Sequence, residues 1–260
     1  MNNRIAIAVV GDFKYLRKHF ATFFSELREN GKFDGEVLVV TSFFTPTILI
    51  KKISKKNNVR VLRFPKIKFS SKANKRLSSL ETNKQPNRHL TKNFQWHKLN
   101  LFDKKIKLWR YVFYLDINMH IHHDINKILG HLPNNQLFAR SDGYPDYERT
   151  LETQFDKTTN EFKELKKEYD LSIKNYFQTG LMYFDTEIIN NQTKKNLINL
   201  VEKYPITLTN EQGIMNLYFI FDNKHYEELI EKIDGYISYY YWMVNSKKII
   251  ITKQLREKYK

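Results

Sequence analysis

Asp116 and Asn118 follow an apolar run that begins at Tyr111, and oxygen-bearing side chains at this spacing could hold a hard divalent cation. A carboxylate at the carboxyl end of a buried strand in an open α/β sheet projects into the crevice where such sheets bind ligands. A cation held there could join the carboxylate to a diphosphate. The alternative is a strand that simply ends in polar residues, because Asp-x-Asn is too short to identify a metal site.

Three histidines close to this pair, His120, His122 and His123, are an alternative set of metal ligands. However, His120 and His122 alternate with apolar residues, which is the period of a β-strand. We therefore interpret these two as residues of a sheet face.

The elements that must position these residues alternate between strand and helix patterns. Ile5–Val10 is a short continuous apolar run, typical of a buried parallel strand, and a helical pattern follows it through Leu27. Similar patterns predict strands at 36–41, 59–64, 136–139 and 181–185, and helices at 46–55, 155–169, 190–203 and 210–221. The order predicts an α/β fold, which we interpret as a single domain over residues 1–260.

Several ligand-binding motifs are missing from the sequence. The first predicted strand is not followed by Gly-x-Gly-x-x-Gly, and neither Gly-x-x-x-x-Gly-Lys-Ser/Thr nor Gly-x-Ser-x-Gly occurs in the chain. A bound diphosphate would therefore have to be neutralised by metal and basic side chains instead of a glycine-rich loop.

Composition limits the class of protein. The 260 residues are 41% hydrophobic and 15% aromatic, which is ample for a core. Because there is no cysteine, disulfides, thiolate metal sites and a cysteine nucleophile are excluded. No apolar run reaches the roughly 20 residues that cross a bilayer, and no export signal is visible, so we expect a cytoplasmic location.

Positive charge is concentrated in residues 51–110, where 19 Lys or Arg face two acidic residues, so that this segment carries +17 and the rest of the chain −1. Its middle, 66–93, is rich in Ser, Asn, Lys and Gln, and we expect a basic, mobile loop. The segment could be merely solvated. It could also contact a polyanion or acidic membrane, or form an electropositive lip that attracts a nucleotide diphosphate.

Four segments, in order, resemble glycogenin-like (family 8-type) retaining glycosyltransferases of the GT-A fold, a Rossmann-like domain with a mixed central sheet. They are AVVGDFKYL (8–16), FQWHKLNLFDKKIKLWRYVFYLDINMHIHHDINKIL (94–129), NYFQTGLMYFDTEII (175–189) and TNEQGIMNLYF (209–219). The resemblance implies a nucleotide-binding half over 1–128 and an acceptor and sugar half over 129–260.

For the nucleotide half, the resemblance implies a UDP-sugar-like donor. Asp116 and Asn118, with Ile117 between them, would take the Asp-x-Asp places and hold Mn²⁺ or Mg²⁺ against its diphosphate, which is Lewis-acid catalysis. Lys98 would lie beside the donor. Base and ribose would contact the first strand and turn, at Val9, Gly11, Asp12 and Tyr15.

For the sugar half, the resemblance implies that Gln178, Thr179 and Gly180 face the transferred sugar and that Asp142 bonds its hydroxyls. Glu211 and Gln212 would occupy an Asp-Gln pair whose acid acts as a nucleophile or stabilises an ion. Alternatively, Glu211 has only a structural role, as an acidic residue that stabilises the first turn of a helix through the helix dipole.

The sequence also departs from this family. Relatives supply a third metal ligand from a His-Phe-x-Gly segment near the carboxyl end, whereas this chain finishes KKIIITKQLREKYK (247–260). Two protein ligands could suffice, metal use could be weak, or catalysis could be lost.

The sequence therefore predicts a retaining, metal-dependent transfer of a sugar to an unknown hydroxyl of a glycan, protein or small molecule. Two other hypotheses remain open. One is a degenerate GT-A domain that binds nucleotide-sugar or glycan without turnover. The other is a basic protein that binds nucleic acid or a membrane surface.

Overall fold

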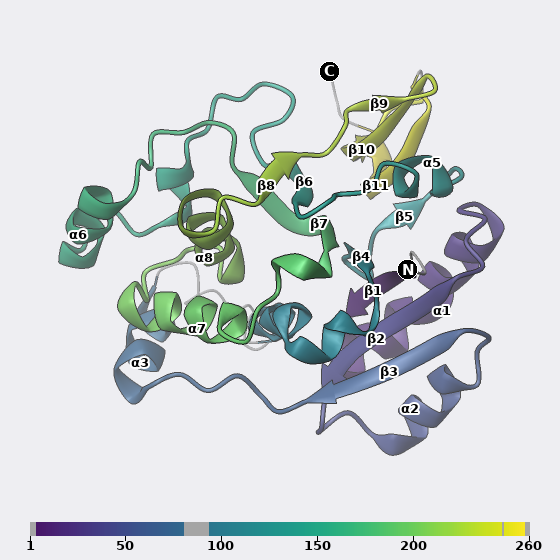
Figure 1. The fold of residues 1–260 in the computed structure, drawn as a ribbon, viewed down its shortest axis with the longest axis horizontal. Coiled ribbons are helices and arrows are strands. Elements are labelled where there is room, and N and C mark those ends of the chain that lie inside the picture. The colour runs from purple at the N-terminus through teal and green to yellow at the C-terminus, as the bar shows by residue number, and fades with distance from the viewer. Residues whose placement is uncertain (1–3, 81–93, 246, 258–260) are drawn as a thin grey trace.

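A mixed seven-stranded sheet forms the centre of the computed structural model, which describes residues 4–80, 94–245 and 247–257. Its strands are β1 (Ile5–Val10), β2 (Glu36–Ser42), β3 (Val59–Phe64), β4 (Tyr111–Leu115), β6 (Leu137–Ser141), β7 (Phe177–Asp185) and β8 (Tyr226–Glu228). They lie in the order β3-β2-β1-β4-β7-β6-β8 (Figure 1). The first four are parallel, whereas β7 runs antiparallel to both β4 and β6. The predicted α/β fold with a mixed central sheet is confirmed.

Both faces of the sheet are buried, which explains why its strands read as continuous apolar runs. Side chains of a strand alternate between the two faces. In β1, accordingly, Ala6 and Ala8 pack in one core cluster, whereas Ile7 and Val9 pack in the other.

Helices cover each face. The face with Ile7 packs against α1 (Phe13–Glu29) and α2 (Thr47–Ser54). The opposite face packs against a 3₁₀ segment at Gln95–Phe102, α7 (Thr193–Lys203) and α8 (Glu211–Asn216), which continues as a π-helix over Leu217–Asp222. Shorter helices are α5 (Asn126–Leu129), α6 (Asn160–Glu168) and 3₁₀ turns at Lys104–Leu108, Leu151–Gln154 and Thr186–Ile188.

A second, four-stranded sheet brings the C-terminal strand next to the residues that follow β4. It contains β5 (His120–Ile121), β11 (Ile249–Glu257), β10 (Tyr236–Met243) and β9 (Lys232–Ile233), in that order. In β11, Thr252 lies opposite His120 of β5. This register places the next residue of β11, Lys253, beside the turn that contains Asp116 and Asn118.

The predicted histidine positions agree with this sheet. His120 lies in β5, with Nδ1 3.0 Å from Glu26 Oε1. His122 lies just beyond β5 and its Nε2 is 2.9 Å from Thr252 Oγ1. Neither histidine lines the cleft described below.

One predicted loop is partly wrong. Within residues 66–93, for which we expected a loop, the structure has a helix, α3 (Ser71–Ser79). The Ser70 side chain caps its N-terminus, Ala73 and Leu77 are buried, and Leu77 packs in the core, which stabilises a helix that composition alone does not suggest. Residues 81–93 of the predicted loop lie outside the described residues.

One predicted helix begins later than expected. The helix expected from residue 155 begins only at Asn160, because Phe155 forms a β-bridge with Thr207.

Among the residues that the structure describes, no helix is both long and apolar enough to span a membrane.

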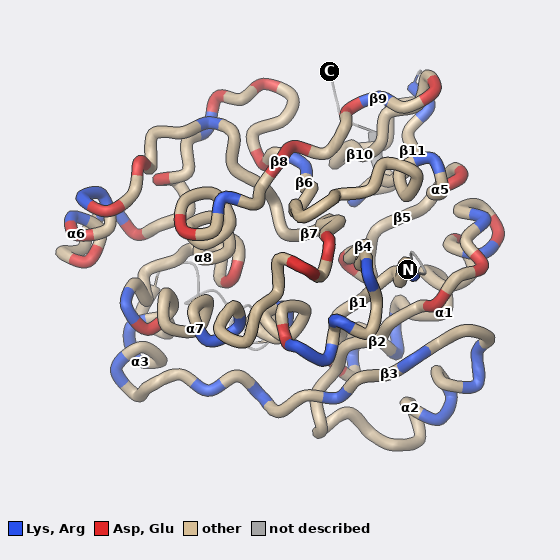
Figure 2. The backbone as a smooth tube through the Cα atoms, in the orientation of Figure 1, with Lys and Arg blue, Asp and Glu red and all other residues tan. Residues whose placement is uncertain are grey.

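Acidic partners neutralise some charges of the basic segment. Figure 2 shows Lys and Arg along α2, β3 and the connection to α3. Described ion pairs that involve residues 51–110 include Arg60–Glu36, Arg76–Asp156, Lys107–Glu187 and Arg110–Asp185. These ion pairs give no support to the predicted polyanion contact.

Candidate functional site

A cleft at the carboxyl ends of β1 and β4 consists of three connected cavities. The first cavity, of about 310 Å³, is lined by Gly11, Asp12, Tyr15, Asp116 and Asn118 among others. The central cavity, of about 690 Å³, shares Gln95, Lys98, Asp116 and Lys253 with the first. The aromatic cavity, of about 520 Å³, shares Asp142, Arg149, Gln178 and Tyr241 with the central one. Together they offer room for an elongated polar ligand.

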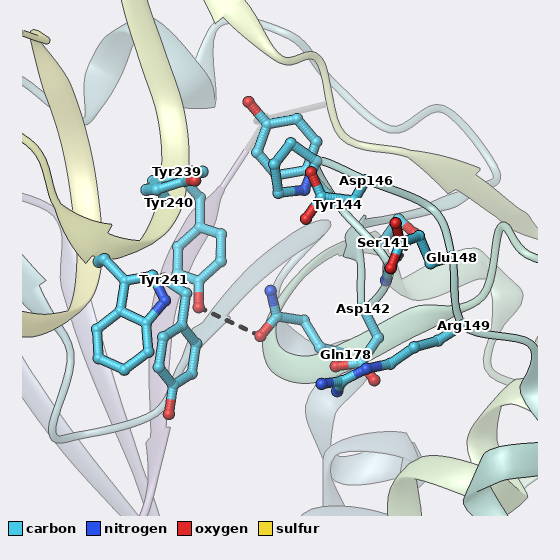
Figure 3. Close-up of a pocket in the computed structure, with 13 residues that line it drawn as sticks. Ser141, Asp142, Tyr144, Asp146, Glu148, Arg149, Gln178, Tyr239, Tyr240 and Tyr241 are labelled. Carbon is cyan, nitrogen blue, oxygen red and sulfur yellow. Dashed lines mark hydrogen bonds between the residues drawn. The ribbon is translucent and has the colours of Figure 1, made fainter. Parts of the chain in front are cut away.

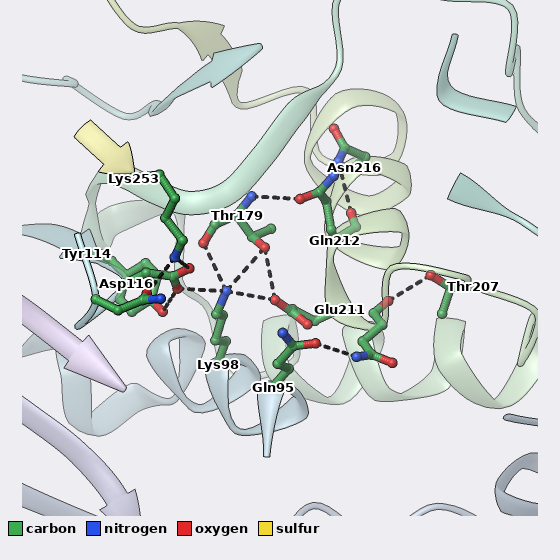
Figure 4. A network of polar contacts seen from close by, with 12 residues as sticks. Gln95, Lys98, Tyr114, Asp116, Thr179, Thr207, Glu211, Gln212, Asn216 and Lys253 are labelled. Atoms are coloured by element: carbon green, nitrogen blue, oxygen red, sulfur yellow. Dashed lines mark hydrogen bonds and ion pairs between the residues drawn. The ribbon is translucent and has the colours of Figure 1, made fainter. Parts of the chain in front are cut away.

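Lys98 joins the two halves of the chain at the floor of this cleft (Figure 4). It is only 7% exposed, and its Nζ lies 3.1 Å from Asp116 Oδ1 after β4 and 2.9 Å from Glu211 Oε1 at the start of α8. It also donates to the Thr179 carbonyl at 3.2 Å, on β7. One buried ammonium thus holds together a strand end, a second strand and a helix start.

Asp116 is bonded on both carboxylate oxygens. Oδ1 accepts from Lys98 and, at 2.6 Å, from the Tyr114 hydroxyl, while Oδ2 accepts from Lys253 Nζ at 2.6 Å. The same Lys253 ammonium donates to Asn118 Oδ1 at 2.6 Å. An ammonium group therefore lies between the two oxygens that were predicted to hold a metal.

Charges in this network keep one another ionised. Burial by itself would lower the pKa of Lys98, but Asp116 and Glu211 outweigh it, so the pKa is raised above its ordinary value. Burial would raise the pKa of Asp116, but Lys253 and Lys98 outweigh it, and this pKa is lowered. At neutral pH Lys98 and Asp116 are therefore both charged.

Glu211 and Gln212 come from the first turn of α8 and face β7. Thr179 Oγ1 donates to Glu211 Oε1 at 2.9 Å, and Gln212 Oε1 accepts from the Thr179 amide at 3.2 Å. Glu211 is 2% exposed, and its Oε2 is buried without a hydrogen-bond partner among the described residues. A buried carboxylate oxygen of this kind at a cavity wall is suited to a ligand with positive charge or a hydroxyl group.

The turn after β1 supplies the wall of the first cavity. Asp12 caps α1 by accepting from the Tyr15 amide at 2.9 Å, and Tyr15, at 39% exposed, is not a core residue. Gly11 and Ile117 also line this cavity, although the Ile117 side chain packs in the core. Val9 is fully buried in the core, and its neighbour Val10 lines the cavity instead.

The remaining predicted residues line the central cavity. Asp142 accepts from the Tyr176 hydroxyl at 3.1 Å, and burial raises its pKa. Gln178 Oε1 accepts from the Tyr239 hydroxyl at 3.2 Å. A Cβ at Gly180 would lie 2.8 Å from Met119 Cε and 3.5 Å from Asp116 Oδ2, so glycine keeps space free beside the aspartate.

The residues present do not fit a divalent cation in this arrangement. Mg²⁺ and Mn²⁺ prefer several oxygen ligands, and the candidate oxygens here are one carboxylate and one amide, both bonded to Lys253. No group of three or more His, Cys, Asp or Glu suited to a metal occurs in residues 4–80, 94–245 and 247–257. A metal at Asp116 and Asn118 would have to displace Lys253.

Lys253 and Tyr241 are site residues that the sequence analysis missed. Lys253 follows Ile249–Ile251, an apolar run that indicates a strand, but the pairing of that strand with β5 cannot be read from the sequence. Tyr241 lies in a tyrosine-rich strand, β10, whose aromatic residues were a usable signal for sugar binding.

Comparison with solved structures identifies the fold of this chain. No protein-family model matches the sequence, and no curated protein matches it. The galactosyltransferase LgtC, solved with donor and acceptor sugar analogues, superposes with a TM-score of 0.54 at 13% identity, covering 86% of this chain and 72% of that one. The mannosyltransferase Ktr4p from S. cerevisiae with GDP gives 0.54 at 11% identity, covering 91% and 72%.

A third similar structure is core-mannan synthase A from Aspergillus fumigatus, in an Mn/GDP form. It gives a TM-score of 0.56 at 10% identity, covering 91% of this chain and 76% of that one. Identities this low are informative about the fold, and activity has to be argued from the site. The chain has the fold of GT-A glycosyltransferases.

Proposed function

We propose that this protein is a glycosyltransferase that moves a sugar from a nucleotide-diphosphate donor, UDP-linked, to an acceptor hydroxyl with retention of anomeric configuration. The buried Lys98 bridge carries the proposal, because it fixes Asp116 beside the first cavity and Glu211 in the central one. The glycogenin-like resemblance, which is the basis for UDP and for retention, is part of this proposal.

The first cavity suits the nucleotide. Its volume of about 310 Å³ lies at the small end of the range for ligand sites, and Tyr15 offers a half-exposed ring against which a base can pack. The diphosphate would then lie at Asp116, Asn118 and Lys253, where the first and central cavities meet. This order leaves the sugar in the central cavity.

Residues of the central cavity suit the reacting sugar. During transfer the bond from C1 of the sugar to the phosphate oxygen breaks with its electron pair, and C1 bonds to the acceptor oxygen. The acceptor proton passes to the departing diphosphate. Positive charge that develops at C1 would be stabilised by the Glu211 carboxylate, while Asp142 and Gln178 would accept from or donate to sugar hydroxyls.

The predicted Mn²⁺ or Mg²⁺ is not part of this proposal, because the residues present do not fit that ion. Cytoplasmic location stays a prediction.

Binding without turnover is the second candidate function. It is favoured by Asn118, because the amide of this residue is neutral, whereas a carboxylate at the same position would carry a negative charge. Turnover is favoured by Glu211, which lines the central cavity and whose buried Oε2 has no hydrogen-bond partner among the described residues, because a domain that only binds has no need of a buried carboxylate there.

A panel of nucleotides tests the donor. UDP and UDP-sugars at 1 mM should raise the melting temperature more than GDP, ADP or CMP do, since a ligand that binds only the folded state stabilises it. Release of UDP from a UDP-sugar, followed by coupled assay, then separates turnover from binding. Equal shifts with all nucleotides, or none, would contradict a UDP-specific site.

The aromatic cavity suits a carbohydrate acceptor. Figure 3 shows Tyr239, Tyr240 and Tyr241 on one side of it, facing Asp142, Glu148 and Arg149. Tyr241 is 42% exposed and also lines the central cavity. An accessible aromatic ring beside charged hydrogen-bonding groups is a surface on which a sugar ring can pack.

Tyr241→Ala should therefore lower kcat/KM for transfer to a sugar acceptor by about tenfold, the size of one aromatic contact. Hydrolysis of the donor in the absence of acceptor should change by less than about twofold. Phe44→Ala is a matched control, because Phe44 is 84% exposed and lines none of the three cavities. Equal losses of transfer and hydrolysis would contradict an acceptor role.

A further inference from the structure

We infer that Lys253 is a built-in cation that takes the place of a divalent metal, so that this protein binds a nucleotide diphosphate without one. The inference rests on the proposed function and deepens it. Its basis is the position of one ammonium group, which bridges the two candidate metal ligands at 2.6 Å each.

The contacts of Lys253 leave one N–H donor of its ammonium group available to a ligand. An ammonium has three N–H donors, and Asp116 Oδ2 and Asn118 Oδ1 account for two. Lys253 lines both the first and the central cavities, and its side chain is 17% exposed. The third N–H can therefore donate to a phosphate oxygen where these cavities meet.

The backbone fixes Lys253 in this place. Ile249, Ile250 and Ile251 are buried and anchor β11, and Thr252 is paired with His120 of β5. A shift of one residue in this register would turn the lysine to the other face of the sheet. The ammonium is thus positioned by a strand on each side, and a fixed charge of this kind stabilises a diphosphate without reorganising.

The surrounding charges disfavour a divalent ion. Lys98 is bonded to one oxygen of Asp116 and Lys253 to the other, so the carboxylate has an ammonium on each side. A metal would have to displace Lys253 and would then face repulsion from Lys98. An anionic diphosphate meets neither obstacle.

Two titrations test the inference. Paramagnetic resonance of free Mn²⁺ measures cation binding without any nucleotide, and calorimetry with UDP in EDTA measures binding without metal. We expect the wild-type protein to leave the Mn²⁺ signal unchanged and to bind UDP equally, within about twofold, in EDTA and in Mn²⁺.

Lys253→Ala should lose UDP affinity in EDTA by about 10- to 100-fold, the effect of one charge-assisted hydrogen bond. It should also gain weak Mn²⁺ binding, because Asp116 Oδ2 and Asn118 Oδ1 lose the ammonium that occupies them while Lys98 stays on Asp116 Oδ1, and Mn²⁺ should restore part of its UDP affinity. Lys248→Ala is a matched control that removes one exposed lysine near the start of β11 and should change neither titration.

The outcomes separate the two proposals. UDP binding by the wild-type protein that requires Mn²⁺, or a wild-type protein that removes free Mn²⁺ from solution, would overturn the role of Lys253 and leave the proposed function standing. Absence of UDP binding with and without Mn²⁺ would overturn the proposed function and the role of Lys253 toward a donor together. Melting temperatures of both variants show whether a loss reflects unfolding.

Discussion

Lys98→Met is expected to lower the free energy of unfolding by about 3–5 kcal/mol at pH 7, because it removes the shared partner of two buried carboxylates. Methionine is unbranched and flexible, so it keeps most of the packing while removing the charge. Asp116 would retain Lys253, but Glu211 would retain only the Thr179 hydroxyl among its described partners. Urea denaturation followed by circular dichroism measures the change.

The pH dependence of this effect has a definite sign. The folded-state pKa of Asp116 is lowered, so its stabilising contribution is complete above about pH 5 and is lost as pH falls through its ordinary value toward the folded one. In Lys98→Met one of the two lysines that lower this pKa is gone. The stability difference between wild-type and variant proteins should therefore narrow as pH falls from about 5 to about 3.

Lys104→Met is the matched control, because Lys104 is exposed and close in sequence, and its replacement should change stability by no more than about 0.5 kcal/mol. A Lys98 variant as stable as this control would mean that the buried network contributes little to the fold. It would also weaken the proposed function, which depends on that network.

The local pattern at the end of β4 and the family resemblance named residues that the structure brings together, although their roles stay predictions. Asp116 follows β4 directly, and Lys98, Thr179 and Glu211, which the resemblance singled out, lie in contact with it or with one another. The reason is physical, since a buried strand forces the residue after it to the sheet edge where other strand ends meet.

Long-range pairing could not be predicted in the same way. Lys253 reaches Asp116 only because β11 pairs with β5, and no local pattern encodes which strands pair or in what register. Likewise α3 depends on burial of Leu77 against distant elements of the core, so a polar composition was a poor guide there. Alternation along β1 places the Val9 side chain in the core, so that Val9 could contact a base only through its backbone.

Glu211→Gln is expected to reduce kcat for release of UDP from the donor by about 10²- to 10³-fold, comparable with the loss of one preorganised group that stabilises transition-state charge. The amide keeps the size of the side chain and can still accept from Lys98 and Thr179. It removes the negative charge near the sugar, where charge develops only in the transition state. UDP affinity should therefore change by less than about threefold.

Steady-state kinetics together with calorimetry separate these two effects, and Glu164→Gln is the matched control, because Glu164 is an exposed acid whose ion pair with Lys167 lies within α6. Full activity in Glu211→Gln would show that this carboxylate does not act on the sugar. Loss of UDP affinity equal to the loss of kcat would indicate instead that Glu211 serves only to hold Lys98 in place. A large fall in kcat with donor binding preserved is the result expected of a group that contacts the reacting carbon.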